Sequence, residues 1–248
     1  MTKAEIQLIR ALQDKRTRTE EGLFVAEGEK LIGEIRASKL RIRKIFCLEG
    51  LFEGAEVECV SAKEMERLSL LKTPSKAVAL VEIPRYELRA KQLKNKLVLA
   101  LDEVQNPGNL GTIIRLADWF GITDIICSRD SADCFNPKVV QATMGAILRV
   151  RVHYVDLEPF LQEAAAHGMA IYGTFLEGEN LYSTTLDEGG IIVMGNEGRG
   201  ISEGVGRCVT HKILIPAYPA DRPTSESLNV AMATGIVCAE FRRRTLKL

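Results

Sequence analysis

Three polar loops carry the residues best suited to chemistry. Each follows an apolar run that predicts a buried strand: DEVQNPGNLGTIIR (102–115) follows LVLAL, GNEGRGIS (195–202) follows IIVM, and PAYPADRPTSESLN (216–229) follows KILI. In open α/β sheets, backbone N–H groups and helix N-termini converge on ligands beyond the carboxyl ends of parallel strands. We therefore expect the three loops to form one binding site.

The glycine-rich loop 195–202 does not match a nucleotide-phosphate motif. G-N-E-G-R-G departs from the dinucleotide fingerprint G-x-G-x-x-G and comes late in the chain, and the sequence contains no G-x-x-x-x-G-K-[ST]. Glycines let a backbone approach a ligand closely, whereas the charge of Glu197 is unfavourable beside phosphate. The loop therefore predicts a ligand that is not held mainly by phosphate, which disfavours a nicotinamide-dependent oxidoreductase.

The first loop leads into a helix predicted over 110–120. Asn109 is a good N-cap residue there, and Gly121 is placed to end the helix. Arg115 falls on the polar side of this helix near Asp118. It could pair with Asp118 at the surface, as on an arbitrary helix, or lie beside a ligand at the strand ends.

The third loop leads into the last predicted helix, SLNVAMATGIVCAEFRRR (227–244). Capping explains Ser225 or Ser227 at its start. Capping does not explain Asn229, which has a mediocre helix propensity and lies inside the predicted first turn. Asn229 is therefore a candidate for a functional role.

The N-terminal third of the chain alternates short strands and helices. Apolar spacing predicts a helix over 5–13, which the basic KRTRTEEG then breaks. Strands are predicted at LFVA, RKIFCL, VECV and AVALVEI, with helices after Gly28 and at SAKEMERLSLL. This pattern predicts a small α/β domain over 1–84, and the charged RYELRAKQLKNK suggests a linker over 85–96.

Residues 97–248 repeat the order strand–helix in longer units. Predicted strands are LVLALDEV, ITDIICS, RVHYV, MAIYGTF, IIVMG and KILIPA, and predicted helices include LGTIIRLADWF, PKVVQATMGAIL and PFLQEAAAH. Near-continuous apolar strands alternating with helices are typical of a parallel sheet covered on both faces. We therefore predict a doubly wound α/β domain.

Composition narrows the class of protein. The chain has 248 residues, 46% of them hydrophobic, and a formal net charge of zero. Its six cysteines include no C-x-x-C pair, and its three histidines do not cluster, so we expect no disulfide framework and no metal site. Because it has no long apolar run and no signal-peptide pattern, we expect a cytoplasmic protein with no membrane segment.

The zero net charge hides an asymmetry. Residues 1–96 contain twenty Lys and Arg but only fifteen Asp and Glu, and RASKLRIRK (36–44) has five basic residues and no acid. Such a segment can bind RNA phosphates, although a solvated face explains its charge equally well. The candidate RNA-binding residues are Arg16, Arg18, Arg41 and Arg43.

The three loops together resemble a known family. N-P-x-N-L-G-x-x-x-R, V-M-G-N-E-G-x-G-I and I-P…E-S-L-N-V-A…A-x-E occur in the order of the three signature motifs of the SpoU (TrmH-type) branch of the SPOUT RNA methyltransferases. The resemblance covers residues 97–244. IQLIRALQDKRTRTEEGLFVAEGEKLI is also similar to the ribosomal-protein-like α/β substrate-binding domain of many members. Asn106, where aspartate is commoner, and a lengthened loop over 216–226 depart from the pattern.

The resemblance implies transfer of a methyl group from S-adenosyl-L-methionine to a ribose 2′-hydroxyl of rRNA or tRNA. It also implies a deep trefoil knot in the C-terminal domain and a homodimer. The alternative is a catalytically inactive RNA-binding protein on the same fold. The motif positions imply catalytic roles for Asn109, Arg115, Glu197, Ser227 and Asn229 and cofactor contacts for Thr174, Gly195, Asn196, Gly198, Ile215 and Leu228.

Arg115 is the motif residue that the family resemblance proposes as the base. A guanidinium stays protonated in nearly all protein settings, which makes such a role difficult. We therefore expect Arg115 mainly to grip an RNA phosphate and stabilise developing alkoxide charge, with Asn109 and Glu197 orienting it. Ser227 and Asn229 would then place the ribose or a water molecule.

Overall fold

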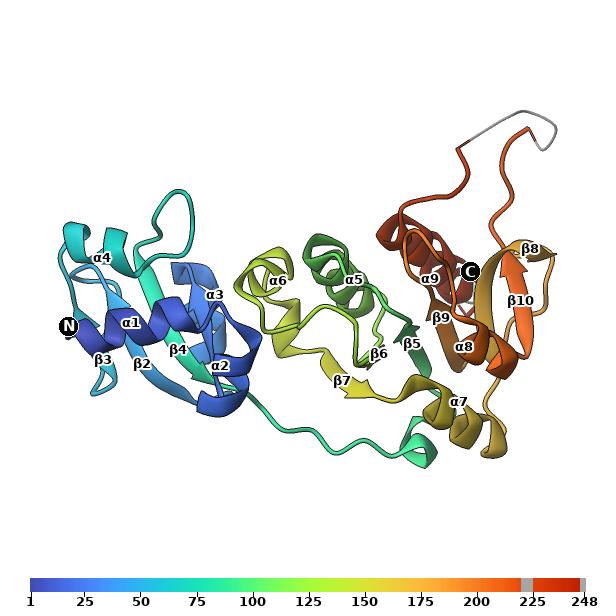
Figure 1. The fold of residues 1–248 in the computed structure, drawn as a ribbon, viewed down its shortest axis with the longest axis horizontal. Helices are drawn as coiled ribbons and strands as arrows, with labels where there is room; N and C mark the ends of the chain where they lie inside the picture. Colours follow the sequence, from blue (N-terminus) through green and yellow to red (C-terminus); the bar gives the residue numbers. More distant parts are fainter. Residues whose placement is uncertain (220–224, 246–248) are drawn as a thin grey trace. The chain divides into compact units, whose positions relative to one another are not determined.

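The computed structural model describes residues 1–219 and 225–245. The chain forms two compact units, coloured along the sequence in Figure 1. The first comprises Met1–Arg85 together with Asp133–Leu148, and the second comprises Tyr86–Ala132 together with the chain from Arg149 onward. The chain therefore passes into the second unit near the predicted boundary 85–96, and residues 133–148 return to the first unit as an insertion.

The first unit is built on a four-stranded sheet of order β1-β4-β2-β3. Its strands are β1 Leu23–Glu27, β2 Ile42–Cys47, β3 Val57–Cys59 and β4 Ala77–Glu82. Its helices are α1 Lys3–Ala11, α2 Lys15–Glu21, α3 Glu29–Arg36, α4 Ala62–Leu68, α6 Pro137–Ala142 and the short 3-10 helix η2 Ala146–Leu148. One apolar cluster joins α1 and α4 to the sheet, and a second joins α3 and α6 to it.

Helix α2 forms where the sequence predicted a break. Asp14 caps it, because its carboxylate accepts hydrogen bonds from the backbone N–H of Arg16 and Thr17, and Gly22 ends it in the left-handed conformation at φ 65°. The KRTRTEE sequence has no apolar period, so capping rather than amphipathic burial marks this helix in the sequence.

The insertion 133–148 packs into the first unit through apolar contacts. The ring of Phe135 lies 4.9 Å from that of Phe24, and Val140 is buried in the cluster that contains Ile32 and Ile35. The helix predicted over 137–148 is interrupted at Met144, whose φ is 51°, and so forms α6 and η2 as separate short helices. The contacts are distant in sequence, which is why the predicted division of the chain does not contain this insertion.

The second unit is an α/β structure with a six-stranded parallel sheet of order β10-β8-β9-β5-β6-β7. The strands are β5 Leu97–Leu101, β6 Asp124–Ser128, β7 Arg151–Val155, β8 Ile171–Asn180, β9 Gly190–Met194 and β10 His211–Leu214. The helices are η1 Ala90–Leu93, α5 Pro107–Trp119, α7 Leu157–Ala166, α8 Glu203–Cys208 and α9 Val230–Thr245. The predicted parallel α/β sheet is thus confirmed, whereas α8 was not predicted.

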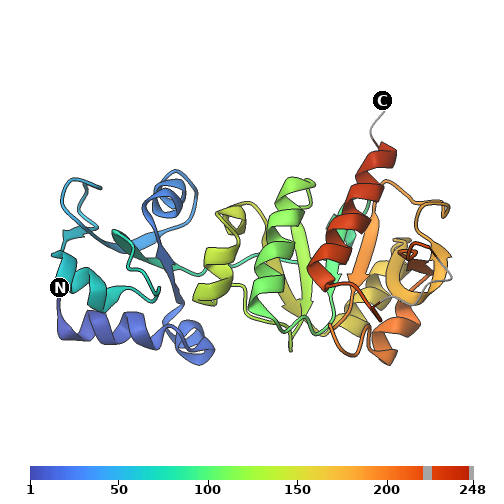
Figure 2. The ribbon, with the colours of Figure 1, turned by 90° about the horizontal axis from the view of Figure 1, so that it is seen from above.

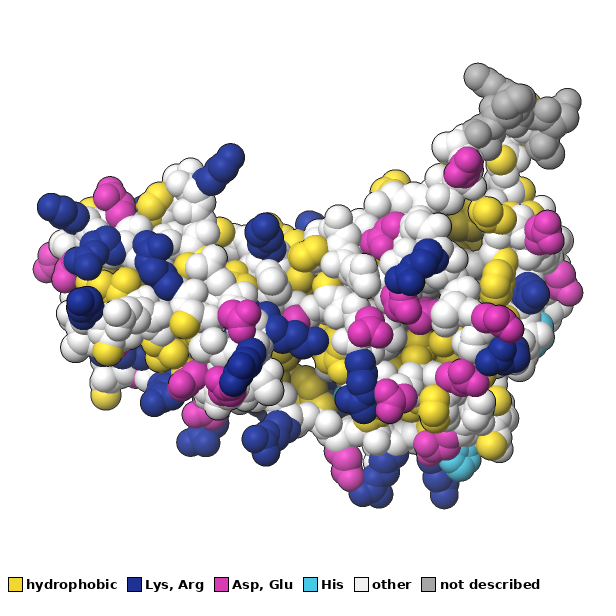
Figure 3. Space-filling view, in the orientation of Figure 1, with side chains coloured by type: hydrophobic (Ala, Val, Ile, Leu, Met, Phe, Trp, Pro, Cys, Tyr) yellow, Lys and Arg dark blue, Asp and Glu magenta, His cyan; other side chains and the backbone are white. Residues whose placement is uncertain are grey.

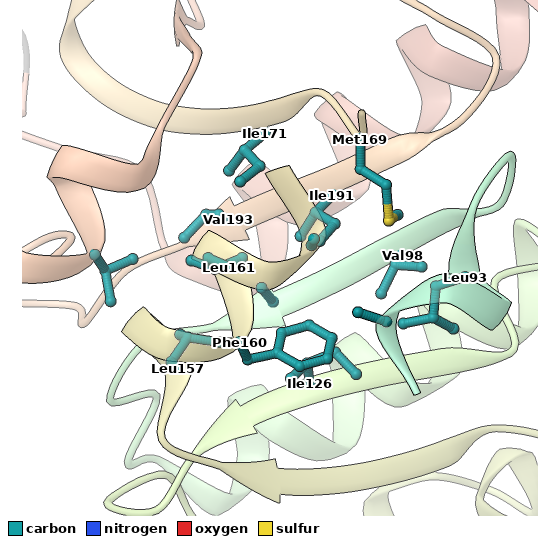
Figure 4. Packing of buried hydrophobic residues seen from close by; sticks show 14 residues of the cluster. Leu93, Val98, Ile126, Leu157, Phe160, Leu161, Met169, Ile171, Ile191 and Val193 are labelled. Atoms are coloured by element: carbon teal, nitrogen blue, oxygen red, sulfur yellow. The ribbon is translucent and has the colours of Figure 1, made fainter. Parts of the chain in front are cut away.

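Helices cover both faces of this sheet (Figures 1 and 2). On one face, Val98 and Ala100 of β5 pack with Phe160 and Leu161 of α7, in the cluster drawn in Figure 4. Because side chains alternate along a strand, the intervening residues of β5 face the other side, where α5 and α9 pack against each other. Helix η1, in the segment predicted as a linker, adds its buried Ala90 and Leu93 to the first of these faces.

The described helices include none with the length and apolar character needed to cross a membrane. The sheet instead serves as a rigid frame for the loops that leave its strands.

Candidate active site

The candidate site lies at the carboxyl edge of the six-stranded sheet. Strands β5 and β9 are neighbours, with Leu101 opposite Met194 in the register, so the loops beginning at residues 102 and 195 start side by side. The backbone N–H of Asp102 also donates to the carbonyl of Met194 at 2.9 Å. The sheet therefore brings two of the three predicted loops together.

Asn109 was expected to cap α5, and this expectation is wrong. Asn106 is the N-cap, since its Oδ1 accepts hydrogen bonds from the backbone N–H of Gly108 at 2.8 Å and Asn109 at 3.2 Å. Pro107 occupies the first helical position, where a missing N–H costs nothing. Asn109 therefore sits inside the first turn with its side-chain amide free for other partners.

The side chains of three motif residues form a hydrogen-bonded chain. Asn109 Nδ2 donates to Glu197 Oε1 at 2.7 Å, and Asn229 Nδ2 donates to Asn109 Oδ1 at 3.0 Å. Glu197 and Asn229 are exposed at the surface, and Asn109 is half-buried. Each comes from a different one of the three loops, so Asn109 links all of them through one amide group.

Asn229, not a serine, caps α9. Its Oδ1 accepts hydrogen bonds from the backbone N–H of Ala231 at 3.0 Å and Met232 at 3.3 Å, and α9 begins at Val230. The expectation that capping could not explain Asn229 was wrong because the helix begins later than predicted. The same side chain thus caps α9 with its oxygen and binds Asn109 with its nitrogen.

Arg115 and Ser227 stand apart from this chain. Both are exposed, and within the described residues neither forms a hydrogen bond or ion pair with another side chain. The surface alternative for Arg115 is also not realised, because Asp118 pairs with Arg149 at 2.8 Å. Arg115 is therefore a guanidinium whose five donors face solvent in this single chain.

The glycine loop is a tight hairpin. Asn196 and Gly200 form an antiparallel bridge, and a Cβ atom on Gly195 would lie only 2.3 Å from the carbonyl carbon of Gly200. Asn196 Oδ1 accepts from the backbone N–H of Gly198 at 2.9 Å and of Arg199 at 3.1 Å. The side chain of Asn196 is thus used within the protein, which leaves backbone groups to contact a ligand.

The remaining predicted cofactor residues, Thr174, Ile215 and Leu228, differ in polarity and burial. Thr174, half-buried in β8 directly after the residues paired with β9, donates from Oγ1 to the carbonyl of Val193 at 3.2 Å. Ile215 is half-buried just after β10, and Leu228 is 50% exposed just before α9. Apolar side chains and backbone groups beside an acid suit an adenosine with a cationic sulfonium better than a polyphosphate, so these residues fit S-adenosyl-L-methionine.

Sequence reasoning missed two residues that hold the hairpin. Ser202 N–H donates to Asp102 Oδ2 at 2.7 Å, and Arg199 forms an ion pair with Glu103. The available signal was position, because Asp102 and Glu103 directly follow the apolar run of β5. The lengthened loop 216–226 includes residues 220–224, which lie outside the described part of the chain.

The basic residues predicted to bind RNA differ in accessibility. Arg18 is only 2% exposed, and its guanidinium donates to Asp133 and to the carbonyl of Leu12, so the structure gives it a structural role rather than access to RNA. Arg16 and Arg41 are exposed and pair with Glu20 and Glu82, respectively. Arg43 is exposed and has no ion-pair partner among the described residues. Figure 3 shows Lys and Arg side chains on the visible face of the first unit.

Proteins of known structure share this architecture. A TrmH-family protein from Porphyromonas gingivalis is 37% identical, with a TM-score of 0.89 and coverage of 98% of this chain and 99% of that one. An AdoMet-bound rRNA methyltransferase from Sinorhizobium meliloti is 30% identical, with a TM-score of 0.87 and coverage of 100% and 97%. The Bacillus subtilis (strain 168) 23S rRNA (guanosine(2553)-2′-O)-methyltransferase RlmP is 29% identical over 238 residues, 93% of each chain.

Two family descriptions match separate parts of the sequence. Residues 3–79 match the MRM3-like substrate binding domain, and residues 96–239 match the SpoU rRNA Methylase family. The second match contains the three loops and covers more than half of the chain. With Asn109, Glu197 and Asn229 joined at the carboxyl edge of a parallel sheet, the chain belongs to the SpoU rRNA methylase family.

Proposed function

We propose that this protein is an RNA methyltransferase that moves a methyl group from S-adenosyl-L-methionine to a ribose 2′-hydroxyl of rRNA or tRNA. The observation that carries the proposal is the hydrogen-bonded chain Asn229–Asn109–Glu197, which joins the three motif loops at one edge of the sheet. Membership of the SpoU family and the names of the relatives support the same reaction.

The reaction demands alignment more than activation of the donor. When bound, S-adenosyl-L-methionine supplies a sulfonium methyl group that is already activated by positive charge. The residues around it must hold a weakly nucleophilic hydroxyl in line and favour loss of its proton. Positioning can provide effective molarities of about 10⁵ to 10⁸ M, and general-base assistance adds roughly 10² to 10⁴.

The side-chain groups that are engaged within the protein, and those that are not, indicate which residue aligns the site and which contacts RNA. Asn109 has its amide oxygen and one of its amide N–H groups engaged, so it fixes Glu197 and Asn229 relative to each other. Ser227, whose hydroxyl has no partner among the described residues, is available to hold the ribose or a water molecule. Arg115 is available to grip an RNA phosphate and to stabilise the developing alkoxide charge.

A homodimer would explain the exposed side chains on α5 and α9. Trp119 is 84% exposed on α5 and Met232 is 64% exposed on α9, and the two helices pack together where Leu116 lies over Gly235. Large exposed apolar side chains mark protein contacts more often when they gather on adjoining elements. Because Arg115 lies one turn before Trp119, a second copy on this surface would bring its own groups close to Arg115.

We assign RNA recognition to residues 1–84 and catalysis to residues 97–248 apart from 133–148, which pack with the first unit, with 85–96 joining the two domains. The matches over 3–79 and 96–239 support this division. Arg16, Arg41 and Arg43 are the accessible cations of the first domain that we retain as RNA ligands. Since rRNA and tRNA are the expected substrates, we assign the protein to the cytoplasm.

A trefoil knot in the second unit is a further part of the proposal. The chain leaves the sheet at its β10 edge and then returns to form α9, which packs on α5, while the hairpin 195–202 is fixed to residues 102 and 103. The path of the chain between β10 and α9 through this region in a crystal structure tests the knot.

The function is tested by measuring binding and methyl transfer separately. We expect calorimetry to detect binding of S-adenosyl-L-methionine, and we expect methyl label to appear in an unmodified 23S rRNA transcript or in total tRNA. Comparison of ribose methylation in RNA from cells with and without the gene then gives the nucleotide. RNA binding without binding of the cofactor would support the alternative, a catalytically inactive RNA-binding protein, and would overturn the proposal.

Arg115→Lys tests the role of the guanidinium. Lysine keeps the charge and could act as a base but loses the two-pronged donor geometry, so we expect kcat to fall by about tenfold or more, or ~1.4 kcal/mol in the barrier. Sedimentation of the variant checks that its oligomeric state is unchanged. Near-full activity would contradict a bidentate role for Arg115.

A further inference from the structure

Glu103 lies between β5 and α5 in a backbone conformation that side chains rarely adopt. Its φ is 55°, in the left-handed region that favours glycine and asparagine. Non-glycine residues persist there only when surrounding contacts compensate, and they occur most often at functional sites. A glutamate at this position therefore implies that its side chain makes a contact that a glycine could not make.

Backbone contacts alone do not explain the glutamate. The N–H of Glu103 donates to Ser128 Oγ at 2.9 Å, and its carbonyl accepts from Asn196 Nδ2 at 2.8 Å. A glycine would make both hydrogen bonds with less strain. The carboxylate is what a glycine lacks, and it forms the ion pair with Arg199.

Glu103 contacts the hairpin through two residues, Asn196 and Arg199, which lie on either side of Glu197 in the sequence. Asn196 precedes Glu197, and its Oδ1 in turn accepts from the backbone N–H groups of Gly198 and Arg199. Arg199 follows two residues after Glu197 and carries the ion pair. A second anchor lies at the base of the hairpin, where the buried carboxylate of Asp102 accepts from Ser202 N–H.

We propose that Glu103 is a positioning residue that fixes the hairpin 195–202, and with it Glu197, in the conformation that receives the cofactor. Glu103 acts through Asn196 and Arg199 and touches neither substrate nor cofactor. The inference rests on the proposed function for its consequence, since a displaced Glu197 would no longer meet Asn109.

The exposure of the ion pair sets the expected size of the effect. Side-chain exposure is 69% for Arg199 and 27% for Glu103. An ion pair of this kind contributes little to global stability, because solvent screens it. Its loss should instead raise the fraction of time that the hairpin is open, since hairpins and loops open locally without global unfolding.

Glu103→Gly is the decisive variant, because it removes the carboxylate, keeps both backbone hydrogen bonds and relieves the left-handed strain. We expect the backbone amides of Gly198, Arg199 and Ser202 to exchange hydrogen roughly 1.5-fold to fivefold faster in the cofactor-free protein, the range for one exposed ion pair. The dissociation constant for S-adenosyl-L-methionine should rise by a similar factor, with little change in the midpoint of thermal unfolding.

Two further variants complete the experiment. Asn95→Gly is a matched control, since Asn95 has a φ of 67° in the same unit but, within the described part of the chain, forms no hydrogen bond with the hairpin, so relief of strain there should leave hairpin exchange and cofactor affinity unchanged. Arg199→Ala should reproduce the effect of Glu103→Gly, and the double variant should be no worse than either single one, because both remove the same pair.

The outcomes separate this inference from the proposed function. Wild-type exchange or wild-type cofactor affinity in Glu103→Gly would overturn the positioning role while leaving methyl transfer by the wild-type protein intact. If the wild-type protein fails to bind S-adenosyl-L-methionine, the proposed function falls. The exchange rates of the cofactor-free variants then still decide whether Glu103 fixes the hairpin.

Discussion

The two edges of the six-stranded sheet concentrate polar residues in different ways. At the amino edge, Asp124 of β6 is nearly fully buried and accepts hydrogen bonds from Arg151 at 2.6 and 2.8 Å and from Thr123 at 2.8 Å, with His153 Nε2 at 3.1 Å. At the carboxyl edge, Glu197 and Asn229 are exposed and Asn109 is half-buried, and two side-chain hydrogen bonds join the three residues.

Because of this difference, a search for strongly perturbed pKa values would not locate the candidate site. Burial by itself would raise the pKa of Asp124, but the hydrogen bonds from His153, Arg151 and Thr123 outweigh it and hold this pKa well below its ordinary range. Strongly perturbed groups are often functional, yet structural ion-pair networks perturb pKa values too. Here the perturbed carboxylate tethers two strands, and the motif residues lie at the opposite edge.

The largest expected effect on stability is at the amino edge. Asp124→Ala removes an acceptor shared by Arg151, which is 42% exposed, and by the buried His153, and leaving a buried polar group without its partner costs about 1 to 3 kcal/mol of unfolding free energy. Chemical denaturation measures this loss. Affinity for S-adenosyl-L-methionine, measured well below the unfolding midpoint, should be unchanged, and a parallel loss of affinity would show that the two edges are coupled.

An exposed ion pair at the other end of β7 provides the control for that variant. Arg129 and Asp156 pair at 2.6 Å with side-chain exposures of 66% and 68%. Asp156→Ala also removes an aspartate carboxylate that pairs with an arginine, but this one is exposed to solvent, where screening leaves little net stabilisation. We expect the unfolding free energy of Asp156→Ala to stay close to that of the wild-type protein.

The opposite pattern is expected at Asn109. Asn109→Asp keeps an acceptor for Asn229 but replaces the donor to Glu197 by a second negative charge, so the two side chains repel. Displacement of an aligning group by about 1 Å can reduce a rate roughly 10²-fold. We expect a loss of this order in kcat with a small change in unfolding free energy, because the pair is exposed. Methyl transfer at saturating RNA and cofactor measures it, and a near-normal kcat would contradict the aligning role.

The dependence of stability on pH provides a further test of the role of Asp124. A carboxylate whose folded pKa is lowered stabilises the fold above its unfolded pKa of about 3.9, and this contribution is lost as pH falls toward the folded value. Unfolding free energy should therefore decline more steeply below about pH 4 in the wild-type protein than in Asp124→Asn. Glu240, whose pKa of about 2 reflects hydrogen bonds from Arg243 and Arg244 against the opposing effect of burial, contributes equally to both proteins. Equal slopes would contradict the assigned role of Asp124.

Some of the fold and site was predictable because its signals are local. Continuous apolar runs such as LVLAL and IIVM specify buried parallel strands, and the three loops that follow strands were placed at one edge from this rule alone. The insertion 133–148 was not predictable in this way. Its place in the first unit depends on contacts such as Phe24 with Phe135 and Arg18 with Asp133, whose sequence separation leaves no periodic pattern.

The helix caps were misassigned for a reason that the sequence does contain. Pro107 favours the first position of a helix, which makes Asn106 the cap and moves Asn109 inside the helix. At α9 the cap is Asn229, four residues after Ser225 and two after Ser227. In both cases an error of a few residues changed the role of an asparagine, because capping and site chemistry use the same amide groups.

The smallest expected effect separates these two roles at Asn229. Asn229→Asp keeps an oxygen to cap α9, and a negative charge at a helix N-terminus is favourable, so stability should be retained. The variant cannot donate to Asn109, so kcat should fall by several-fold. Asn229→Ala loses both functions and should also lose about 1 kcal/mol of unfolding free energy. If Asn229→Asp were fully active and Asn229→Ala inactive, the residue would serve the site only by fixing the start of α9.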